Sequence, residues 1–427
     1  MDIQIPKSKK KRIVIVGGGF AGLSIINKLD NKMFQVVLVD RCNYHQFQPL
    51  IYQVASAGLE SDSISFPFRK LFSKKKDFYF RLAEVYSIHT HDNKIETSIG
   101  FISYDYLVLA AGTTTNFFGN KAVMESALPM KSIEEALVLR NTLLLNLEKA
   151  LDCSDLNEKQ ALMNIVIVGG GATGVEVAGA LSEMKHYIIP KDYPDLKNCN
   201  LNIYLAEGTD RILGVFSKQS SENALNSLKK MGVNVILNQL VTDYKDDEVI
   251  FKDGQKIRTK TLIWVSGVTS ESFDGISKDV IGHAGRLLVN EFNQLAGYTN
   301  VFVIGDICLQ NEEAYPKGHP QVAQVAIQQG KLLAKNLKNI ETGRKKEPFH
   351  YRNLGSLATI GRNKAVADLT FIKLHGFPAW AVWMLVHLRS ILGVRNKIIV
   401  LMNWIWNYFT YDQSKRFILF IRPRKSH

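Results

Sequence analysis

Two glycine-rich segments have the composition and spacing of a turn that binds phosphate. The stretch IVIVGGGFAGLSIINKL at 13–29 returns as IVIVGGGATGVEVAGAL at 165–181. In each copy a β-branched run leads into glycines and then a helical pattern, which predicts a strand, a tight turn and a helix. Free N–H groups at the start of such a helix bind a pyrophosphate. The turn glycines are Gly17, Gly18, Gly19 and Gly22, then Gly169, Gly171 and Gly174. The sequence therefore predicts two dinucleotide-binding units.

Each unit also has a carboxylate at the end of its next strand. Asp40 closes the run VVLVD, and Glu207 follows the run LNIYLA. A carboxylate at this place accepts hydrogen bonds from the ribose hydroxyls and repels a 2′-phosphate. Glu207 therefore favours NADH over NADPH, although Arg211 lies nearby. Either acid taken alone could be an ordinary strand-end residue.

Three further buried strands are predicted, and each ends in small or acidic residues. They are YDYLVLAAGT at 104–113 with Ala111 and Gly112, TLIWVSGV at 261–268 with Gly267, and VFVIGD at 301–306 with Asp306. In flavoproteins that bind two dinucleotides, the NAD domain is inserted in the FAD domain. The chain then returns in a strand whose final aspartate contacts the FAD ribityl chain. This order assigns FAD to the N-terminal unit and NADH to the second one. A plain helix N-cap is the alternative for Asp306.

A row of glutamines follows in QVAQVAIQQG at 321–330. Written as a helix, this segment places Gln321, Gln324 and Gln328 on one stripe among small and apolar residues. A buried amide without a partner costs a few kcal/mol. A polar head group docked beside the flavin is one candidate partner for these amides. The neighbouring backbone is the other.

The totals and the motif order together predict the architecture. A chain of 427 residues, 46% hydrophobic and 22% charged, has enough core for two or three domains. We expect an α/β fold of two Rossmann-like dinucleotide-binding domains, followed by a C-terminal membrane-associating helical region. The predicted ranges are 1–125 for the first part of the FAD domain, 160–290 for the NADH domain, 291–345 for the returning part of the FAD domain with the glutamine helix, and 346–427 for the C-terminal region.

The four cysteines are scattered along the chain, without a CxxC pair. This spacing argues against a dithiol redox centre and against a zinc site, and we expect no bound metal. It is typical of free thiols in a reducing compartment. The N-terminal stretch MDIQIPKSKKKR lacks an apolar run and is not expected to be a secretory signal. The cysteines are Cys42, Cys153, Cys199 and Cys308.

The net charge of +13 is concentrated at the two ends of the chain. Residues 1–12 carry a net charge of +4 and residues 361–427 carry +9. The segment 376–427 also holds four of the five tryptophans, and its apolar runs are shorter than the roughly 18–20 residues that span a bilayer. Short apolar helices flanked by Trp, Lys and Arg are typical of an anchor in the plane of an anionic membrane surface. The alternative is a buried helical hairpin or a homodimer interface. The tryptophans are Trp380, Trp383, Trp404 and Trp406.

Several motifs together resemble one flavoprotein family. They are VIVGGGFAGL at 14–23, NYHQFQPLIYQVASAGL at 43–59, YDYLVLAAGTTTNFFG at 104–119, VIVGGGATGVEVAGAL at 166–181, VFVIGD at 301–306 and AQVAIQQGK at 323–331. The sequence is similar to type II NADH:quinone oxidoreductases, the single-subunit alternative NADH dehydrogenases. The resemblance covers nearly the whole chain, and AQxAxQQ is its most telling element. The segment WVSGV, where relatives usually read W-x-AGV, and the acidic loop at 311–313 depart from the pattern.

The resemblance implies a function and three further site residues. Two electrons would pass from NADH through FAD to a membrane quinone, without proton pumping. Gln324 and Gln328 would border the quinone site beside the flavin, and Gln324 would contact the cofactor as well. Glu176 would lie near the nicotinamide and take part in proton or charge transfer. The expected location is the cytoplasmic face of the cell membrane, with the protein attached peripherally.

Two other classes of flavoprotein remain open from the sequence. A sulfide:quinone oxidoreductase shares the fold but needs positioned cysteines, and only Cys308, close to Asp306, is suggestive. A basic flavoprotein that acts by binding, like the apoptosis-inducing-factor group, would contact nucleic acid. Its only support is the charge of +13, because the aromatic residues lie inside apolar runs rather than on a polar face. We therefore expect no nucleic-acid partner.

Overall fold

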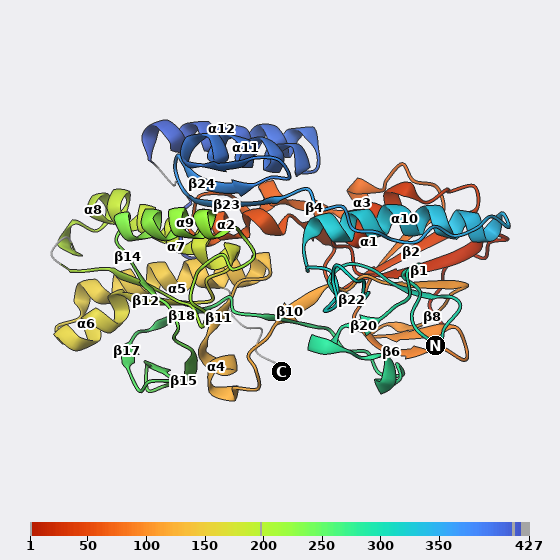
Figure 1. The fold of residues 1–427 in the computed structure, drawn as a ribbon, viewed down its shortest axis with the longest axis horizontal. Coiled ribbons are helices and arrows are strands. Elements are labelled where there is room, and N and C mark those ends of the chain that lie inside the picture. The colour runs from red at the N-terminus through yellow and green to blue at the C-terminus, as the bar shows by residue number, and fades with distance from the viewer. Residues whose placement is uncertain (1, 197–198, 412–414, 420–427) are drawn as a thin grey trace. The chain divides into compact units, whose positions relative to one another are not determined.

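The computed structural model describes residues 2–196, 199–411 and 415–419 (Figure 1). Contacts between Cα atoms divide the chain into two units, each built from three segments. Unit 1 comprises Met1–Gln46, Ser65–Thr114 and Val268–Leu354. Unit 2 comprises Phe47–Ile64, Thr115–Gly267 and Gly355–His427.

Unit 1 is built on a five-stranded parallel sheet with the strand order β21-β9-β1-β2-β5. The central strand contains the run IVIV, and Ile13, Val14 and Ile15 have no exposed surface. A run that is apolar on both faces is typical of a parallel strand covered on both sides. The strands are β1 (Lys11–Val16), β2 (Phe34–Asp40), β5 (Phe78–Leu82), β9 (Tyr106–Leu109) and β21 (Val301–Val303).

Two helices of unit 1 pack closely against each other. They are α1 (Phe20–Lys28) and α10 (Ala323–Glu341). A Cβ added at Gly330 would lie 2.7 Å from the carbonyl oxygen of Ala21, so only glycine allows this approach. The shorter elements of unit 1 are β3 (Tyr44–Gln46), β4 (Ser65–Pro67), α3 (Phe68–Leu71), β6 (Val85–His89), β7 (Lys94–Thr97), β8 (Gly100–Ser103), β19 (Val268–Ser270), β20 (Leu287–Leu288) and β22 (Cys308–Leu309).

Unit 2 repeats the pattern with a second five-stranded parallel sheet, in the order β11-β18-β12-β13-β14. Its strands are β11 (Leu128–Pro129), β12 (Asn164–Val168), β13 (Asn202–Ala206), β14 (Val233–Ile236) and β18 (Thr261–Trp264). Its other elements before the C-terminal region are α2 (Ile51–Ala55), α4 (Lys121–Ser126), α5 (Ile133–Asp152), α6 (Leu156–Met163), α7 (Ala172–Tyr187), α8 (Ile189–Asp192), α9 (Lys218–Lys230), β15 (Val241–Lys245), β16 (Glu248–Phe251) and β17 (Lys256–Arg258). Strand β10 (Thr113–Thr115) spans the boundary between the units.

The C-terminal part of unit 2 is a small antiparallel sheet covered by two helices. Its elements are β23 (Ser356–Gly361), β24 (Lys364–Asp368), β25 (Lys373–His375), α11 (Gly376–Ser390) and α12 (Val394–Thr410). Figure 1 shows α11 and α12 on one side of β23 and β24, and α7 on the other. Among the described residues, no helix combines the length and the apolar character needed to cross a bilayer.

The predicted α/β fold with two Rossmann-like units is confirmed. The division by contacts follows different lines from the ranges predicted by function. It groups 268–290 with unit 1, together with the segments that carry the first fingerprint. It also groups the C-terminal sheet and helices with the second fingerprint, in unit 2.

Candidate active site

The first glycine-rich turn joins β1 to α1 in unit 1. Gly17 has a positive φ of 100°, and a Cβ there would lie 2.4 Å from the carbonyl oxygen of Ala110. A Cβ at Gly22 would lie 2.0 Å from the carbonyl oxygen of Gly17, so this glycine allows helix and turn to close together. By contrast, a Cβ at Gly19 would meet no atom within 4 Å. The turn is therefore tightly packed on its inner side and open beside Gly19.

Asp40 lies at the end of β2 and holds this turn from the side. Its carboxylate accepts hydrogen bonds from the amide of Gly18 at 2.6 Å and from the amide of Cys42 at 2.7 Å. Burial raises the pKa of Asp40, and the two amides act in the opposite direction. The predicted carboxylate thus lies directly against the predicted turn.

Two neighbouring strands bring further predicted residues to the same edge of the sheet. Ala111 and Gly112 follow β9, and Asp306 follows β21, which pairs in parallel with β9. The Thr113 hydroxyl donates to the Asp306 carboxylate at 3.5 Å. Gln321 donates its side-chain amide to the Asp306 carbonyl oxygen at 3.0 Å. Since ligands of parallel α/β sheets bind at the carboxyl ends of strands, Asp306 is placed where a nucleotide would lie.

The second turn, in unit 2, has the same construction between β12 and α7. Gly169 has a φ of 114°, and a Cβ there would lie 2.8 Å from the carbonyl oxygen of Val265. A Cβ at Gly174 would lie 1.9 Å from the carbonyl oxygen of Gly169. At Gly171 a Cβ would again meet no atom within 4 Å. The structure thus repeats both the close packing and the open side.

Glu207 occupies the position that Asp40 has in unit 1. Its carboxylate accepts hydrogen bonds from the amide of Gly170 at 2.7 Å and from the amide of Thr209 at 2.8 Å. Arg211 donates instead to the carbonyl oxygen of Gly214 at 2.8 Å. Gly267 follows β18 with a φ of 80°, and a Cβ there would lie 2.6 Å from the ring of Phe118.

Both turns have the features that a dinucleotide requires. The open sides of Gly19 and Gly171 leave room for a pyrophosphate to approach the backbone. A carboxylate has about four lone-pair positions, and Asp40 uses two of them on amides of its own loop. The remaining positions can accept ribose hydroxyls. The residues therefore fit FAD at the first turn and NADH at the second.

Glu176 projects from the second turn of α7, on the face toward β23. A Cβ at Gly179 would lie 1.7 Å from the carbonyl oxygen of Ile360, so the helix lies directly on this strand. Desolvation raises the pKa of Glu176 to about 8, while the amide of Thr359, 3.5 Å away, and the nearby Trp383 indole oppose the shift. The sequence suggested that the helix dipole stabilises a charged Glu176. In the structure desolvation outweighs the dipole, so the carboxyl holds a proton at neutral pH.

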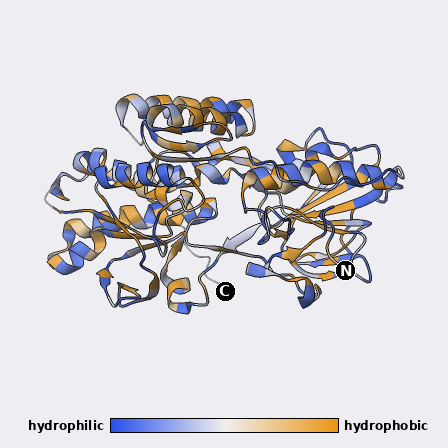
Figure 2. Ribbon diagram, viewed as in Figure 1, coloured by the Kyte–Doolittle hydropathy of each residue, from blue (hydrophilic) through white to orange (hydrophobic). Residues whose placement is uncertain are grey.

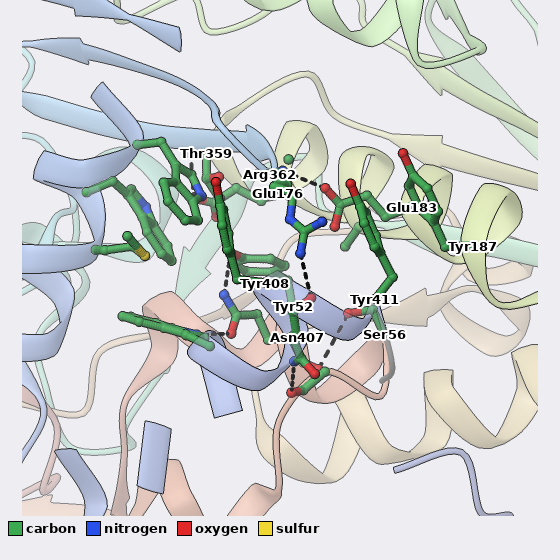
Figure 3. Close-up of a pocket in the computed structure, with 18 of the residues that line it drawn as sticks. Tyr52, Ser56, Glu176, Glu183, Tyr187, Thr359, Arg362, Asn407, Tyr408 and Tyr411 are labelled. Carbon is green, nitrogen blue, oxygen red and sulfur yellow. Dashed lines mark hydrogen bonds between the residues drawn. The ribbon is translucent and has the colours of Figure 1, made fainter. Parts of the chain in front are cut away.

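Glu176 lines a cavity of ≈130 Å³ within unit 2 (Figure 3). The walls come from α2 and the turn after it, α7, β23 and the turn after it, and the helices α11 and α12. Aromatic rings form much of the surface, and the Trp404 indole donates to the side chain of Gln53 at 2.9 Å. Sequence reasoning did not foresee this cavity, because its walls are far apart in the chain.

The glutamine stripe differs from the pattern written as one helix. Helix α10 begins at Ala323, so Gln321 precedes it. Gln324 accepts a hydrogen bond from the amide of Leu354 at 2.9 Å. Gln328 accepts from the amide of Arg352 at 3.1 Å and donates to the carbonyl oxygen of the same residue at 2.9 Å. The backbone partners that the sequence left open are therefore present, in the segment just before the C-terminal sheet.

The neighbouring Gln329 is the deeply buried glutamine, which sequence reasoning missed. Its side chain is 1% exposed, accepts from the amide of Gly305 at 2.7 Å and donates to the Cys308 sulfur at 3.4 Å. The QQ dipeptide was the available signal, because adjacent residues of a helix face different directions. Burial raises the pKa of the Cys308 thiol to about 11. Such a thiol is protonated and a poor nucleophile at neutral pH.

The C-terminal helices combine buried and exposed aromatic residues. Trp383 is only 2% exposed and belongs to the core, whereas the sequence placed it at a membrane interface. Trp406 and Phe409 are 59% and 77% exposed. Figure 2 shows apolar residues along both α11 and α12. The helices therefore have a packed side and an apolar outer side.

Two family models match this chain over almost its full length. The pyridine nucleotide-disulphide oxidoreductase model matches residues 11–330. The NDH2 C-terminal domain model matches residues 353–411. The first range contains both glycine-rich turns and the start of α10, and the second contains the small sheet with α11 and α12.

Proteins with assigned names and solved structures agree with these models. The chain is 32% identical to the type II NADH:quinone oxidoreductase Ndh of Mycobacterium tuberculosis, over 93% of this chain and 88% of that protein. It is 30% identical to a mitochondrial internal alternative NAD(P)H-ubiquinone oxidoreductase of Arabidopsis thaliana, over 96% and 86%. The structure of NDH2 from Plasmodium falciparum in complex with NADH has the same fold, with a TM-score of 0.89, 22% identity and coverage of 96% and 100%. The chain belongs to the type II NADH:quinone oxidoreductase family.

Proposed function

We propose that the protein oxidises NADH and passes two electrons, through bound FAD, to a membrane quinone without pumping protons. Family membership supports this reaction. The observation that carries it in the chain itself is Glu207, which is held against the second glycine turn at 2.7 Å from the Gly170 amide. A carboxylate in this position selects a nucleotide with free ribose hydroxyls, and NADH is such a donor.

Each part of the site has a proposed role. FAD supplies the two-electron chemistry that links NADH to the quinone. The chain 1–125 and 291–345 holds this cofactor, with Asp40 on its ribose and Asp306 on its ribityl chain. The chain 160–290 holds NADH. Glu176 keeps a proton available at neutral pH, and its place on α7 sets that proton near the nicotinamide.

Gln324 and Gln328 are proposed to border the quinone site. Both are half-buried on α10. Their hydrogen bonds to Leu354 and Arg352 fix the orientation of the two amides. Gln324 is the stronger candidate for contact with the quinone, because Gln328 makes two bonds with a single backbone residue.

Attachment to a membrane surface is proposed through the outer side of α11 and α12. The exposed apolar side chains there include Leu385 at 68% and Phe409 at 77%. The turn between the helices is basic, with Arg389, Arg395 and Lys397. Apolar area together with basic residues suits an anionic leaflet, here on the cytoplasmic face of the cell membrane. A homodimer through these helices is the alternative use of the same surface.

The proposed reaction is tested directly with purified protein. Its absorption spectrum should contain bound flavin, and anaerobic NADH should bleach that flavin while sulfide should not. Addition of a short-chain quinone should restore the colour and produce quinol. Bleaching by sulfide and not by NADH would support the sulfide:quinone class instead. The high pKa of the Cys308 thiol disfavours that class.

A further inference from the structure

Quinone reduction by NADH consumes one proton from solvent in each turnover. The quinone gains two electrons and two protons, while NADH gives up two electrons and one proton. The second proton must therefore reach the site from outside, and this requirement rests on the function proposed above. Glu176 is densely surrounded by protein, so its proton has to be replaced through a defined route.

A second carboxyl lies on the same stripe of α7. Glu183 is seven residues beyond Glu176, which corresponds to about 10 Å along a helix and nearly the same face. The small side chain of Ala180 lies between them, and all three residues line the cavity of ≈130 Å³. Figure 3 shows both carboxyls on this wall. The distance is too long for direct proton transfer, but water can bridge it.

The cavity is suited to hold that water. One buried water molecule needs roughly 10–15 Å³ measured in this way, so the cavity has room for several. Polar groups line it at both ends. Arg362 donates to the carbonyl oxygen of Asn407 at 2.7 Å, and the amide of Gln53 donates to the Tyr52 hydroxyl at 2.8 Å. A dry cavity would instead be lined by apolar groups alone.

Glu183 lies at the end of the cavity where positive charge is concentrated. It accepts a hydrogen bond from the amide of Arg362 at 2.5 Å. A Cβ at Gly361 would come within 2.8 Å of the same carboxyl oxygen, so the glycine makes room for the acid. Desolvation raises the pKa of Glu183, whereas Arg362 and Lys364 lower it. These opposing influences allow the group both to lose and to regain a proton.

The other titratable groups around Glu183 cannot replace it. Desolvation raises the pKa of Tyr52 well above its usual range. Tyr187 stacks on Tyr411 with ring centroids 4.0 Å apart, and the pKa of Tyr187 is also raised. Both phenols therefore stay protonated at neutral pH. Arg362 lies over the Tyr411 ring at 3.6 Å and stays charged.

We propose that Glu183 is a proton relay, which connects solvent to Glu176 through water in this cavity. A proton enters at the Arg362 end, binds to Glu183, and moves along the water past Ala180 to Glu176. Glu176 in turn replaces the proton used in quinone reduction. Glu183 acts through Glu176 and is a positioning residue, since it does not touch the substrates.

Two variants test the relay in the complete flavin-bound enzyme. Glu183→Gln removes the exchangeable proton and keeps the shape, and Ala180→Leu fills the water path while leaving both carboxyls in place. Glu222→Gln, on the exposed face of α9, is the matched control. Quinone reduction should fall about tenfold in both test variants, most strongly at alkaline pH where protons are scarce. Reduction of ferricyanide, which takes electrons without protons, should keep its rate, and Glu183→Asp should restore part of the quinone rate.

A second measurement does not depend on turnover. The carboxyl C=O band of Glu176, assigned by its loss in Glu176→Gln, should exchange hydrogen for deuterium more slowly in Glu183→Gln and in Ala180→Leu. Unchanged exchange, or an equal loss of quinone and ferricyanide reduction, would overturn the relay and leave Glu183 as a structural partner of the Arg362 turn. If the wild type reduced ferricyanide but no quinone, the proposed function would fail, and the exchange rates would still decide on the relay.

Discussion

The side-chain amide of Gln328 makes two hydrogen bonds with the main chain of Arg352, one as acceptor at 3.1 Å and one as donor at 2.9 Å. This pairing resembles one step of a β-ladder, made by a side chain instead of a strand. It ties α10 to the segment that leads into the C-terminal sheet. Gln328 is therefore expected to matter for stability, and Gln324 to matter for the quinone.

Gln328→Leu should lower the free energy of unfolding by roughly 1–2 kcal/mol, because two neutral hydrogen bonds are lost at a half-buried site. Flavin reduction by NADH should keep its rate. Urea titration measures the first effect and rapid mixing the second. Gln324→Leu should slow flavin reoxidation by quinone and raise the apparent quinone KM, while Lys331→Ala on the exposed face of α10 serves as control for both. A stable Gln328→Leu protein with slow quinone reoxidation would reverse the two assignments.

Glu207→Gln should weaken NADH binding about tenfold, equivalent to roughly 1.4 kcal/mol, since the ribose loses a charged acceptor. NADPH should be affected less, because its 2′-phosphate is no longer repelled. The FAD content should not change, as Glu207 lies in the other unit. Steady-state KM values for both nucleotides measure the preference. An unchanged ratio of the two would show that Glu207 serves only to hold the Gly170 turn.

Asp306→Ala should yield protein depleted of FAD, since the carboxylate lies at the sheet edge where the first nucleotide is proposed to bind. Asp306→Asn keeps the shape and the capacity to hydrogen-bond, so it should retain more flavin. The ratio of flavin absorbance to protein in the purified variants gives the result. Full occupancy in Asp306→Ala would mean that the cofactor is held elsewhere.

Glu176→Gln should change how stability depends on pH. The folded-state pKa of Glu176 is raised from 4.5 to about 8, so the folded protein binds the proton more tightly than the unfolded chain. This residue therefore makes stability fall as pH rises from 4.5, and its effect levels off above about 8. The variant lacks this loss, so its advantage should grow over that range, to roughly 1–3 kcal/mol. Urea unfolding at several pH values tests it, and a constant difference between the proteins would contradict the assigned pKa.

Trp406→Ser combined with Phe409→Ser should release the protein from anionic liposomes, because both side chains are largely exposed on α12. Turnover with long-tailed quinones should fall more than turnover with soluble acceptors. Trp383→Phe is the matched control, as its parent residue is buried. Flotation measures binding. Retention of the double variant on liposomes would move the anchor to another surface, such as the basic residues 7–12.

The parts that could be predicted from the sequence depend on short-range spacing. A glycine turn and the carboxylate of the next strand lie within one βαβ unit, so Asp40 and Glu207 were found with their correct neighbours. The cavity could not be predicted, because Tyr52, Glu176 and Arg362 come from three distant segments. The partner of Gln328 was missed for the same reason. Trp383 was placed wrongly because an apolar run with tryptophans has the same composition whether it meets lipid or protein.

The close contact at Gly179 explains how two copies of one unit became different. In the repeat, Gly179 corresponds to Asn27, Glu176 to Ser24 and Glu183 to Asn31. Helix α1 is covered by α10, and there the small residue that permits contact is Gly330 of the covering helix. Helix α7 is covered by β23, and there the glycine belongs to the repeat itself. The duplicated unit thus kept its nucleotide turn in both copies, while the opposite side of its helix diverged according to the segment that covers it, and only one copy gained the pair of acids.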